Sequence, residues 1–189
     1  MKPMLQTADH TTLPVRIYED DQYHDVRIIR TRQALHRIIQ PQFSIVELGC
    51  GTGDISGSVS DICTVKGFEC NVLAAATALE RFPNLSVGVC DMMHVPAVPC
   101  DVIIMTEMLE HMEYPIALVK SWFPQAQYSL ISHPLEEPQD SDLSGGEHRW
   151  SYDHIDFLNW FRFGGHELIY FDVFKLGDYT DVLGIGKRI

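Results

Sequence analysis

The sequence lacks any long apolar run. Of its 189 residues 46% are hydrophobic, but no stretch approaches the roughly 18 consecutive apolar residues that a membrane-spanning helix needs. The opening residues, MKPMLQTADH, also lack the apolar segment of a secretory signal. We therefore expect a cytoplasmic protein with no membrane partner.

Paired cysteines are missing as well. The five cysteines are odd in number, form no C-x-x-C pair and mostly lie in apolar, strand-like segments. This pattern indicates reduced, buried thiols in a reducing compartment and excludes a disulfide or zinc framework.

Positive charge is scarce. The chain has 14 Lys and Arg against 26 Asp and Glu, a formal net charge of −12. A surface that follows a phosphate backbone needs clustered Lys and Arg, so long nucleic acid is disfavoured and a small-molecule substrate is favoured. The length fits one domain, residues 1–189. The oligomeric state, monomer or homodimer, stays open.

The first 25 residues are polar and predict an irregular N-terminal arm. From Val26 to Gln40 apolar residues recur at helical spacing, and Pro41 ends the predicted helix. The arginines of this helix fall on other faces, which predicts a solvated surface more strongly than a substrate clamp.

The best-defined motif is the stretch FSIVELGCGTGD, residues 43–54. A short buried strand stops at three glycines, Gly49, Gly51 and Gly53, where the backbone can turn with positive φ or touch a ligand. A short helix can open at Asp54, so free N–H groups would face a ligand at a positive helix end. Glu47, two residues before Gly49, suits a ligand that carries a cation. The G-x-G-x-x-G spacing of dinucleotide-binding loops is absent.

Acidic residues end the next strands. Residues 62–69 predict a second strand that ends at Glu69, twenty residues after Gly49, the offset at which nucleotide-binding sheets place a carboxylate for ribose hydroxyls. Asn71 precedes a predicted helix. The third strand, residues 85–90, is followed by Asp91 and Met92. Each acid could also be an ordinary surface or turn residue.

Two sequence motifs resemble those of a known protein family. Glu47-Leu-Gly49-Cys50-Gly51-Thr52-Gly53 resembles the first motif of class I S-adenosylmethionine-dependent methyltransferases of types 11, 12 and 23. DVIIMTEMLEHMEYP, residues 101–115, resembles their fourth-strand motif. The resemblance covers roughly residues 43–134.

The resemblance implies an α/β fold: a three-layer α/β/α sandwich whose mostly parallel seven-stranded sheet ends in an antiparallel strand. It also implies S-adenosylmethionine as cofactor, S-adenosylhomocysteine as product and methyl transfer to a small-molecule acceptor that the sequence does not identify. The cofactor-binding residues that it implies are Glu47, Gly49, Cys50, Gly51, Gly53, Glu69, Asn71, Asp91, Met92 and Glu107.

The second half predicts a helix over 115–123, a strand over 127–132, a substrate-side loop over 133–149, a helix over 150–163 and two closing strands over 166–176 and 181–188. His148 stands where the resembled family often places a histidine over the substrate pocket, although a structural role is as well supported. His133 is the second candidate base.

Two other functions stay open. On a helix, Glu107, Glu110 and His111 would share one face. With His148 they resemble the Mg²⁺ or Mn²⁺ site of small-RNA 2′-O-methyltransferases, although the same string occurs in metal-free relatives and the acidic chain suits RNA poorly. The other alternative is a non-catalytic binding or regulatory protein that keeps the fold. A NAD(P)-linked oxidoreductase is disfavoured by the glycine spacing.

Overall fold

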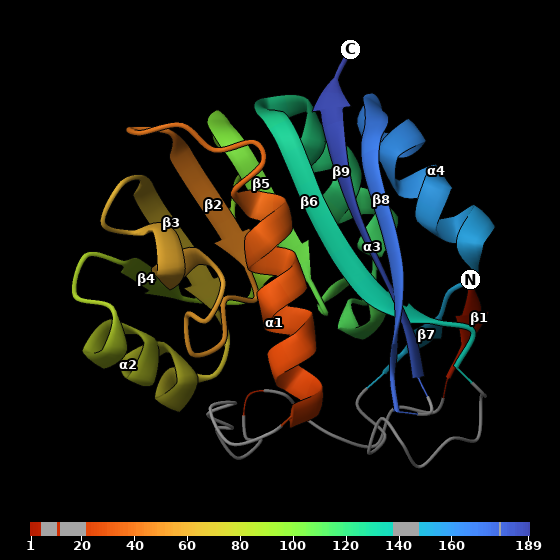
Figure 1. Cartoon of the computed structure of the whole chain (residues 1–189), viewed down its shortest axis with the longest axis horizontal. Helices are drawn as coiled ribbons and strands as arrows, with labels where there is room; N and C mark the ends of the chain where they lie inside the picture. The colour runs from red at the N-terminus through yellow and green to blue at the C-terminus, as the bar shows by residue number, and fades with distance from the viewer. Residues whose placement is uncertain (5–10, 12–21, 138–147, 178) are drawn as a thin grey trace.

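The computed structural model describes residues 1–4, 11, 22–137, 148–177 and 179–189. A seven-stranded sheet forms the middle layer, with strand order β4-β3-β2-β5-β6-β9-β8 (Figure 1). The strands are β2 (Ser44–Leu48), β3 (Thr64–Glu69), β4 (Ser86–Val89), β5 (Cys100–Thr106), β6 (Ala126–Leu135), β8 (His166–Leu176) and β9 (Tyr179–Arg188). The predicted sandwich is confirmed.

Six strands run in one direction, and β9 is antiparallel to both of its neighbours, β6 and β8. From β2 the chain proceeds to β3 on one side, whereas β5 pairs with β2 on the other. The strand order therefore reverses between β2 and β5. At such a switch point the two connections diverge and leave a crevice at the carboxyl ends of the strands, where ligands of open α/β sheets bind.

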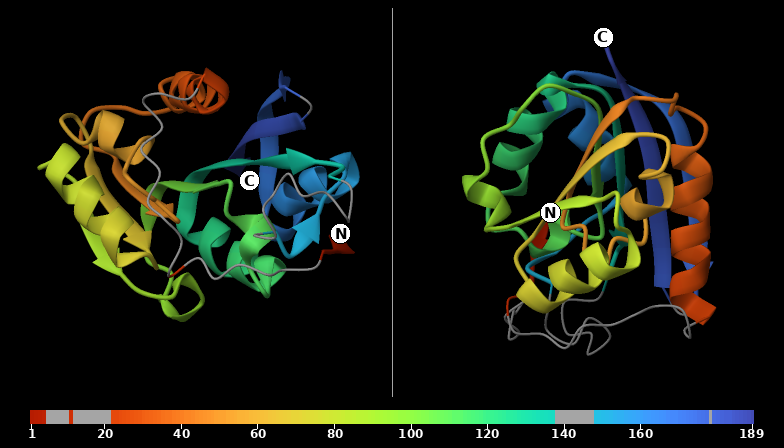
Figure 2. Two further views of the ribbon diagram at one scale, coloured as in Figure 1. Left: turned by 90° about the horizontal axis from the view of Figure 1, so that it is seen from below. Right: turned by 90° about the vertical axis from the view of Figure 1, so that its left-hand side faces the viewer.

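Helices cover both faces of the sheet (Figure 2). On one face α1 (Gln22–Leu35), the 3₁₀ turn η2 (Ser56–Val59) and α2 (Val72–Arg81) share a buried cluster with the sheet. On the other, α3 (Pro115–Trp122), η5 (Phe123–Gln125) and α4 (His154–Gly164) pack through Leu118, Trp122, Phe157 and Phe161. Two further turns, η3 (Met92–His94) and η4 (Leu109–His111), follow β4 and β5 and join this second core.

Side-chain caps fix where the helices begin. Asn71 Oδ1 accepts hydrogen bonds from the backbone N–H groups of Leu73 and Ala74 at the start of α2. Asp153 and Asp156 form a capping box at the start of α4, and Gly165 ends that helix with φ of 71°. Each cap supplies partners for backbone groups that a helix end leaves unpaired.

The second half of the chain differs from prediction in two places. Strand β6 continues to Leu135, past the predicted end at residue 132, because β9 pairs with it as far as Leu135 and Thr180. Trp150–Ser151 forms strand β7, paired with β1 (Lys2–Pro3), so the helix predicted from residue 150 begins at His154. Much of the predicted arm (1–25) and substrate-side loop (133–149) lies outside the described residues.

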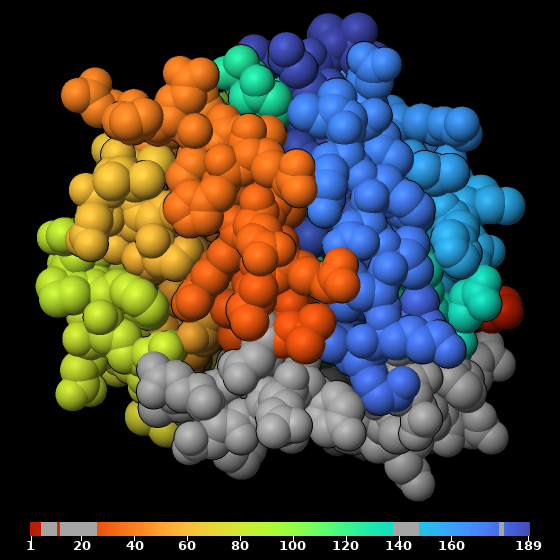
Figure 3. Space-filling view, in the orientation of Figure 1, coloured from red at the N-terminus to blue at the C-terminus, as the bar shows by residue number. Residues whose placement is uncertain are grey.

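Helix α1 crosses one face of the sheet next to β8 (Figure 3). Arg30 Nη1 lies 2.7 Å from Asp172 Oδ2, and its guanidinium carbon lies 4.9 Å from the ring centre of Phe174. Arg27 is partly buried and forms ion pairs with Glu107 and Asp181. The prediction of a solvated arginine face is therefore wrong for Arg27 and incomplete for Arg30.

None of the helices that the structure describes is long and apolar enough to cross a bilayer. All five cysteines are free thiols, and Cys50 and Cys63 are buried.

Candidate functional site

The loop after β2 has three glycines in the left-handed region, with φ of 72° at Gly49, 51° at Gly51 and 80° at Gly53. A Cβ added at Gly49 would lie 2.8 Å from Met108 Cγ, so packing forbids a side chain there. At Gly51 no heavy atom lies within 4 Å of the Cβ position. Gly51 therefore faces open space, as a backbone that meets a ligand would.

The carboxylate of Glu69 is joined to this loop. Its Oε2 accepts a hydrogen bond from the Gly51 N–H at 2.8 Å, and its Oε1 accepts one from the Asn71 N–H at 2.8 Å. Glu69 ends β3 and is buried. The predicted ribose-binding acid thus stands beside the glycine loop, while Asn71 uses its own side chain to cap α2.

Glu47 is buried at the centre of the sheet's carboxyl edge. Its Oε2 accepts a hydrogen bond from the Ser56 N–H at 3.1 Å. Burial raises the pKa of Glu47 to about 8, because removal from water disfavours the charged form. A cationic group placed next to this carboxyl would reverse that effect.

A cavity of about 160 Å³, the loop cavity, lies between α1, the glycine loop and the end of β5. It is smaller than the roughly 300 Å³ or more of pockets that enclose a whole drug-sized ligand, so it fits one end of such a molecule. Five predicted cofactor residues line it: Glu47, Gly49, Cys50, Gly51 and Glu107.

The other predicted residues lie outside its lining. A Cβ at Gly53 would meet Phe82 at 3.0 Å, so this glycine allows close packing of α2. Asp91 Oδ1 accepts a hydrogen bond from the Met93 N–H at 2.9 Å, and its exposed carboxylate lies beside His94. Met92 is buried in the core. Asp91 and Met92 follow β4, next to β3 and Glu69 in the sheet.

Glu107 closes the loop cavity on the side of β5. It is a non-glycine residue with φ of 51°, a conformation that costs strain energy and turns its carboxylate toward β6 and α1. Oε1 accepts a hydrogen bond from Ser132 Oγ at 2.6 Å, and Oε2 lies 3.0 Å from Arg27 Nη1.

Arg27 is a site residue that the sequence did not single out. Its Nε donates to Asp181 Oδ2 at 2.8 Å, and it lines the loop cavity. Burial lowers the pKa of Arg27, but the carboxylates of Glu107 and Asp181 outweigh it and raise the pKa above its ordinary value. Because one partner, Glu107, directly follows β5 and the other, Asp181, lies on β9, only tertiary structure reveals this role.

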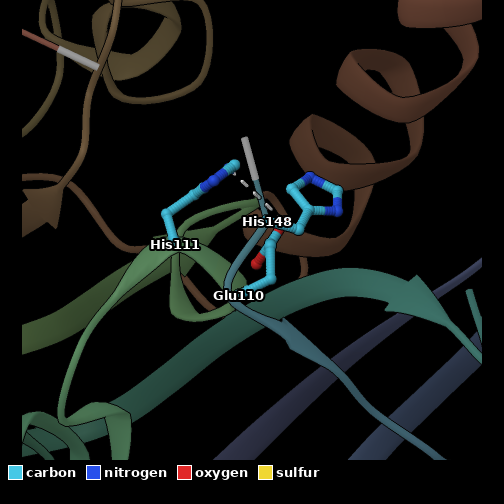
Figure 4. Close-up of side chains that lie close together, drawn as sticks. All are labelled: Glu110, His111 and His148. Atoms are coloured by element: carbon cyan, nitrogen blue, oxygen red, sulfur yellow. Dashed lines mark ion pairs between the residues drawn. The ribbon is translucent and has the colours of Figure 1, made fainter. Parts of the chain in front are cut away.

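Glu107, Glu110 and His111 do not share a helix. Residues Leu109–His111 form a single 3₁₀ turn, and Glu107 points to Arg27 instead. The predicted four-residue metal set is therefore wrong in including Glu107. Glu110, His111 and His148 do meet: one potential ligand atom of each lies within 4.8 Å of the others (Figure 4).

His148 is held by a residue that the sequence did not identify. Its Nδ1 lies 2.5 Å from Oε2 of Glu137, which is buried at the end of the described part of the acidic loop. The Arg149 N–H donates to the Glu110 carbonyl at 2.8 Å and ties this segment to η4. The run of acids after Leu135 was visible in the sequence, but no spacing marked Glu137.

His133 is not a substrate-side residue. It is fully buried in β6, its Nε2 accepts a hydrogen bond from Trp160 Nε1 at 3.3 Å, and its ring contacts Tyr152 and Phe157. Burial lowers the pKa of His133 to about 4. The prediction of His133 as a base is wrong, because both ring nitrogens are enclosed by the core.

Residues 46–123 match the family model of the methyltransferase domain. A comparison with curated protein sequences finds no significant match. The matched region runs from β2 to the start of η5 and contains the glycine loop, Glu69, Asp91, Glu107 and the η4 turn.

The structure is similar to magnesium protoporphyrin IX methyltransferase (ChlM) from Synechocystis PCC 6803, solved with bound S-adenosylhomocysteine. The TM-score is 0.75 and the identity 14%, over 91% of each chain. A putative methyltransferase from Bacillus halodurans C-125 matches with a TM-score of 0.71 and 10% identity, over 86% of this chain and 99% of that one. The [4+2]-cyclase SpnF matches with a TM-score of 0.74 and 11% identity, over 97% and 89%.

The middle of the chain thus matches a methyltransferase domain, and the whole chain has the fold of methyltransferases such as ChlM, as the resemblance of its sequence implied. At these identities the similar structures show the fold alone. SpnF, described as a cyclase, has the same fold, so the reaction and the acceptor have to be argued from the site.

Proposed function

We propose that the protein transfers a methyl group from S-adenosylmethionine to a small-molecule acceptor. The observation that carries this proposal is the open, left-handed Gly51, whose N–H is bound by Glu69 and whose free side faces the cavity lined by Glu47. Methyl transfer from a sulfonium has a neutral leaving group. The protein therefore contributes mainly by holding nucleophile and methyl group in line.

The loop cavity suits the amino-acid end of the cofactor. The Glu47 carboxylate would accept a hydrogen bond from the ammonium group. The backbone at Gly49 and Gly51 would lie against the ligand. Thr31 Oγ1 lines the cavity and has no hydrogen-bond partner among the described residues, so a bound carboxylate would satisfy it. Arg27 is the one cation among the described lining residues and would balance that carboxylate.

The nucleoside would extend from the cavity along the carboxyl ends of β3 and β4. Glu69 would accept hydrogen bonds from the ribose hydroxyls. Asp91 and Met92, which follow the next strand, would bound the adenine. Glu69 keeps its position without a ligand because two backbone N–H groups hold it.

The acceptor would bind beyond Glu107, where His148 and Glu137 lie. The net charge of −12 favours a small, neutral or cationic acceptor over RNA. Glu107 stands apart from Glu110, His111 and His148, so one of the four residues on which the RNA 2′-O-methyltransferase alternative rested lies outside the group. A non-catalytic binding protein would bind the cofactor equally well, so only turnover separates it from an enzyme.

Calorimetric titration with S-adenosylhomocysteine tests the first half of the proposal. We expect micromolar binding to the wild type, and the absence of saturable binding by the folded protein would overturn the proposal. Release of S-adenosylhomocysteine from S-adenosylmethionine, screened over hydroxyl-, amine- and thiol-bearing small molecules, would then identify the acceptor. Cofactor binding without turnover on any acceptor would favour the binding-protein alternative.

A further inference from the structure

Glu110 is a buried carboxylate whose position is not explained by the part of the chain that the structure describes. The residue is 1% exposed, and neither carboxylate oxygen has a hydrogen-bond partner among the described residues. The nearest cationic candidate, His111 Nε2, lies 3.9 Å from Oε1, beyond hydrogen-bond distance. Arg27 is already bound to Glu107 and Asp181. A charge buried in this way is costly unless something pairs with it.

The two histidines beside it face the same space (Figure 4). The ring centres of His111 and His148 are 4.7 Å apart at an angle of 67°, so the rings are not stacked. One ligand atom of each histidine and one of Glu110 lie within 4.8 Å of one another. A tetrahedral ion holds its ligands at about 2.0–2.1 Å, so that two ligands lie about 3.3 Å apart, and the most widely separated pair here would need to approach by about 1.5 Å at most.

A hydrogen bond to Glu137 fixes the orientation of the His148 ring. The Glu137 carboxylate accepts a hydrogen bond from His148 Nδ1–H at 2.5 Å, which leaves the Nε2 lone pair for another partner. Carboxylates that hold a histidine in this way are typical of metal ligands. Trp150 Nε1 donates to the Met112 carbonyl at 2.8 Å, which ties the segment after His148 to the residue that follows η4. The three side chains are thus arranged before any ligand arrives.

We propose that Glu110, His111 and His148 bind one divalent transition-metal ion, with Glu137 positioning His148. Two imidazoles and one carboxylate suit Zn²⁺, Co²⁺ or Fe²⁺ better than Mg²⁺, which prefers oxygen ligands and octahedral geometry. Three protein ligands leave at least one coordination position for a molecule from outside. The set differs from the predicted one, because Glu107 is absent and the orienting acid is Glu137.

The role of the ion rests on the proposed function. Glu107 lines the loop cavity, and Glu110 and His111 lie in the η4 turn that begins two residues later, so the ion would lie near the end of the cofactor that the cavity holds. An acceptor hydroxyl bound to it would lose its proton to solvent more easily. The oxygen lone pair would then form the new C–O bond as the S–C bond breaks, giving the methyl ether, S-adenosylhomocysteine and one proton. The inferred acceptor class is therefore a small hydroxylated molecule.

Metal binding is tested on full-length, tag-free protein that has been treated with chelator. Calorimetric titration with ZnCl₂ and absorption spectroscopy with CoCl₂ should each show one ion per chain. Glu110→Gln, His111→Gln and His148→Gln should each weaken binding at least tenfold, and Glu137→Gln about 10- to 100-fold. His36→Gln, at an exposed position after α1, is the matched control and should bind like the wild type.

The proposal is overturned if the folded wild type binds neither ion, or if binding is the same in the wild type, Glu110→Gln and His111→Gln. Circular dichroism checks that each variant folds, and if Glu110→Gln does not fold, the partly exposed His111 decides the outcome. S-adenosylhomocysteine titrated in the presence of EDTA is a separate measurement. If it binds while metal does not, only the metal site fails, and the reverse result would overturn the proposed function alone.

Discussion

Glu69 Oε2 accepts a hydrogen bond from the backbone N–H of Gly51 at 2.8 Å, so a side chain at the end of β3 fixes the loop that follows β2. A second bond from the Asn71 N–H, also at 2.8 Å, holds the other carboxylate oxygen. The acid proposed to bind ribose is therefore also the residue that shapes the glycine loop.

Glu69→Gln should weaken both functions. An amide offers one oxygen instead of two, so one of the two backbone N–H groups loses its acceptor, at a cost of about 1–3 kcal/mol. We expect S-adenosylhomocysteine affinity to fall about 10- to 100-fold by calorimetry, together with a lower free energy of unfolding in urea. Glu80→Gln, exposed on α2, serves as control and should change neither value. Unchanged affinity in Glu69→Gln would remove the carboxylate from the proposed site.

Gly51→Ala separates ligand contact from backbone strain. Gly51 and Gly165 have φ of 51° and 71°, and at both an added Cβ meets no heavy atom within 4 Å. Alanine at either position should cost about 1–2 kcal/mol of stability, because L-residues disfavour this conformation. Of these two glycines, only Gly51 lines the loop cavity. Calorimetry should therefore show at least a tenfold loss of S-adenosylhomocysteine affinity in Gly51→Ala and none in Gly165→Ala; equal losses would contradict the proposal.

Cofactor binding should release protons from Glu47. Its pKa of about 8 leaves the carboxyl mostly protonated at pH 7, and a bound ammonium group favours the ionised form. Binding should therefore release roughly one proton, and affinity should rise between pH 6 and pH 7 by up to about tenfold. Titrations in buffers of different ionisation enthalpy measure the proton count. Glu47→Gln should bind more weakly and without release, whereas proton uptake by the wild type would rule out this role.

His133 should make the fold sensitive to acid. Its pKa is about 4 in the folded protein against about 6.5 in an unfolded chain. Between these values the unfolded state binds more protons, so stability falls as pH drops from 6.5 to 4, by a few kcal/mol at most. His133→Gln cannot take up that proton. Its free energy of unfolding in urea should fall less steeply over this range than that of the wild type or of His36→Gln.

The sequence predicted the sheet well because its signals are local. Buried strands read as apolar runs, the glycines mark a turn that side chains would strain, and Asn71 is a helix cap within two residues of Glu69. Each of these features depends only on residues close to it in the sequence. The order of the motifs along the chain then matched that of the resembled family, whose strand order could be carried over.

Features that depend on distant pairing were missed. The end of β6 is set by β9, and strand β7 exists because residues 2 and 3 pair with it. Arg27 looked like a surface residue because Asp181, its partner, lies 154 positions away. Helical spacing wrongly placed Glu107 with Glu110, since its positive φ turns the chain before η4 begins. Glu137 became a candidate only once the fold brought it to His148.

The position of β9 between β6 and β8 has a consequence during synthesis. Strand β8 leaves the ribosome before β9, and it pairs with the sheet only through β9. Until β9 has been synthesised, β8 therefore has no strand to pair with. Phe157 and Phe161 of α4 pack closely over Gly184 and Gly186 of β9. A nascent chain that ends within β8 would therefore expose this aromatic face, and chaperones that recognise apolar segments would meet it at that stage of translation.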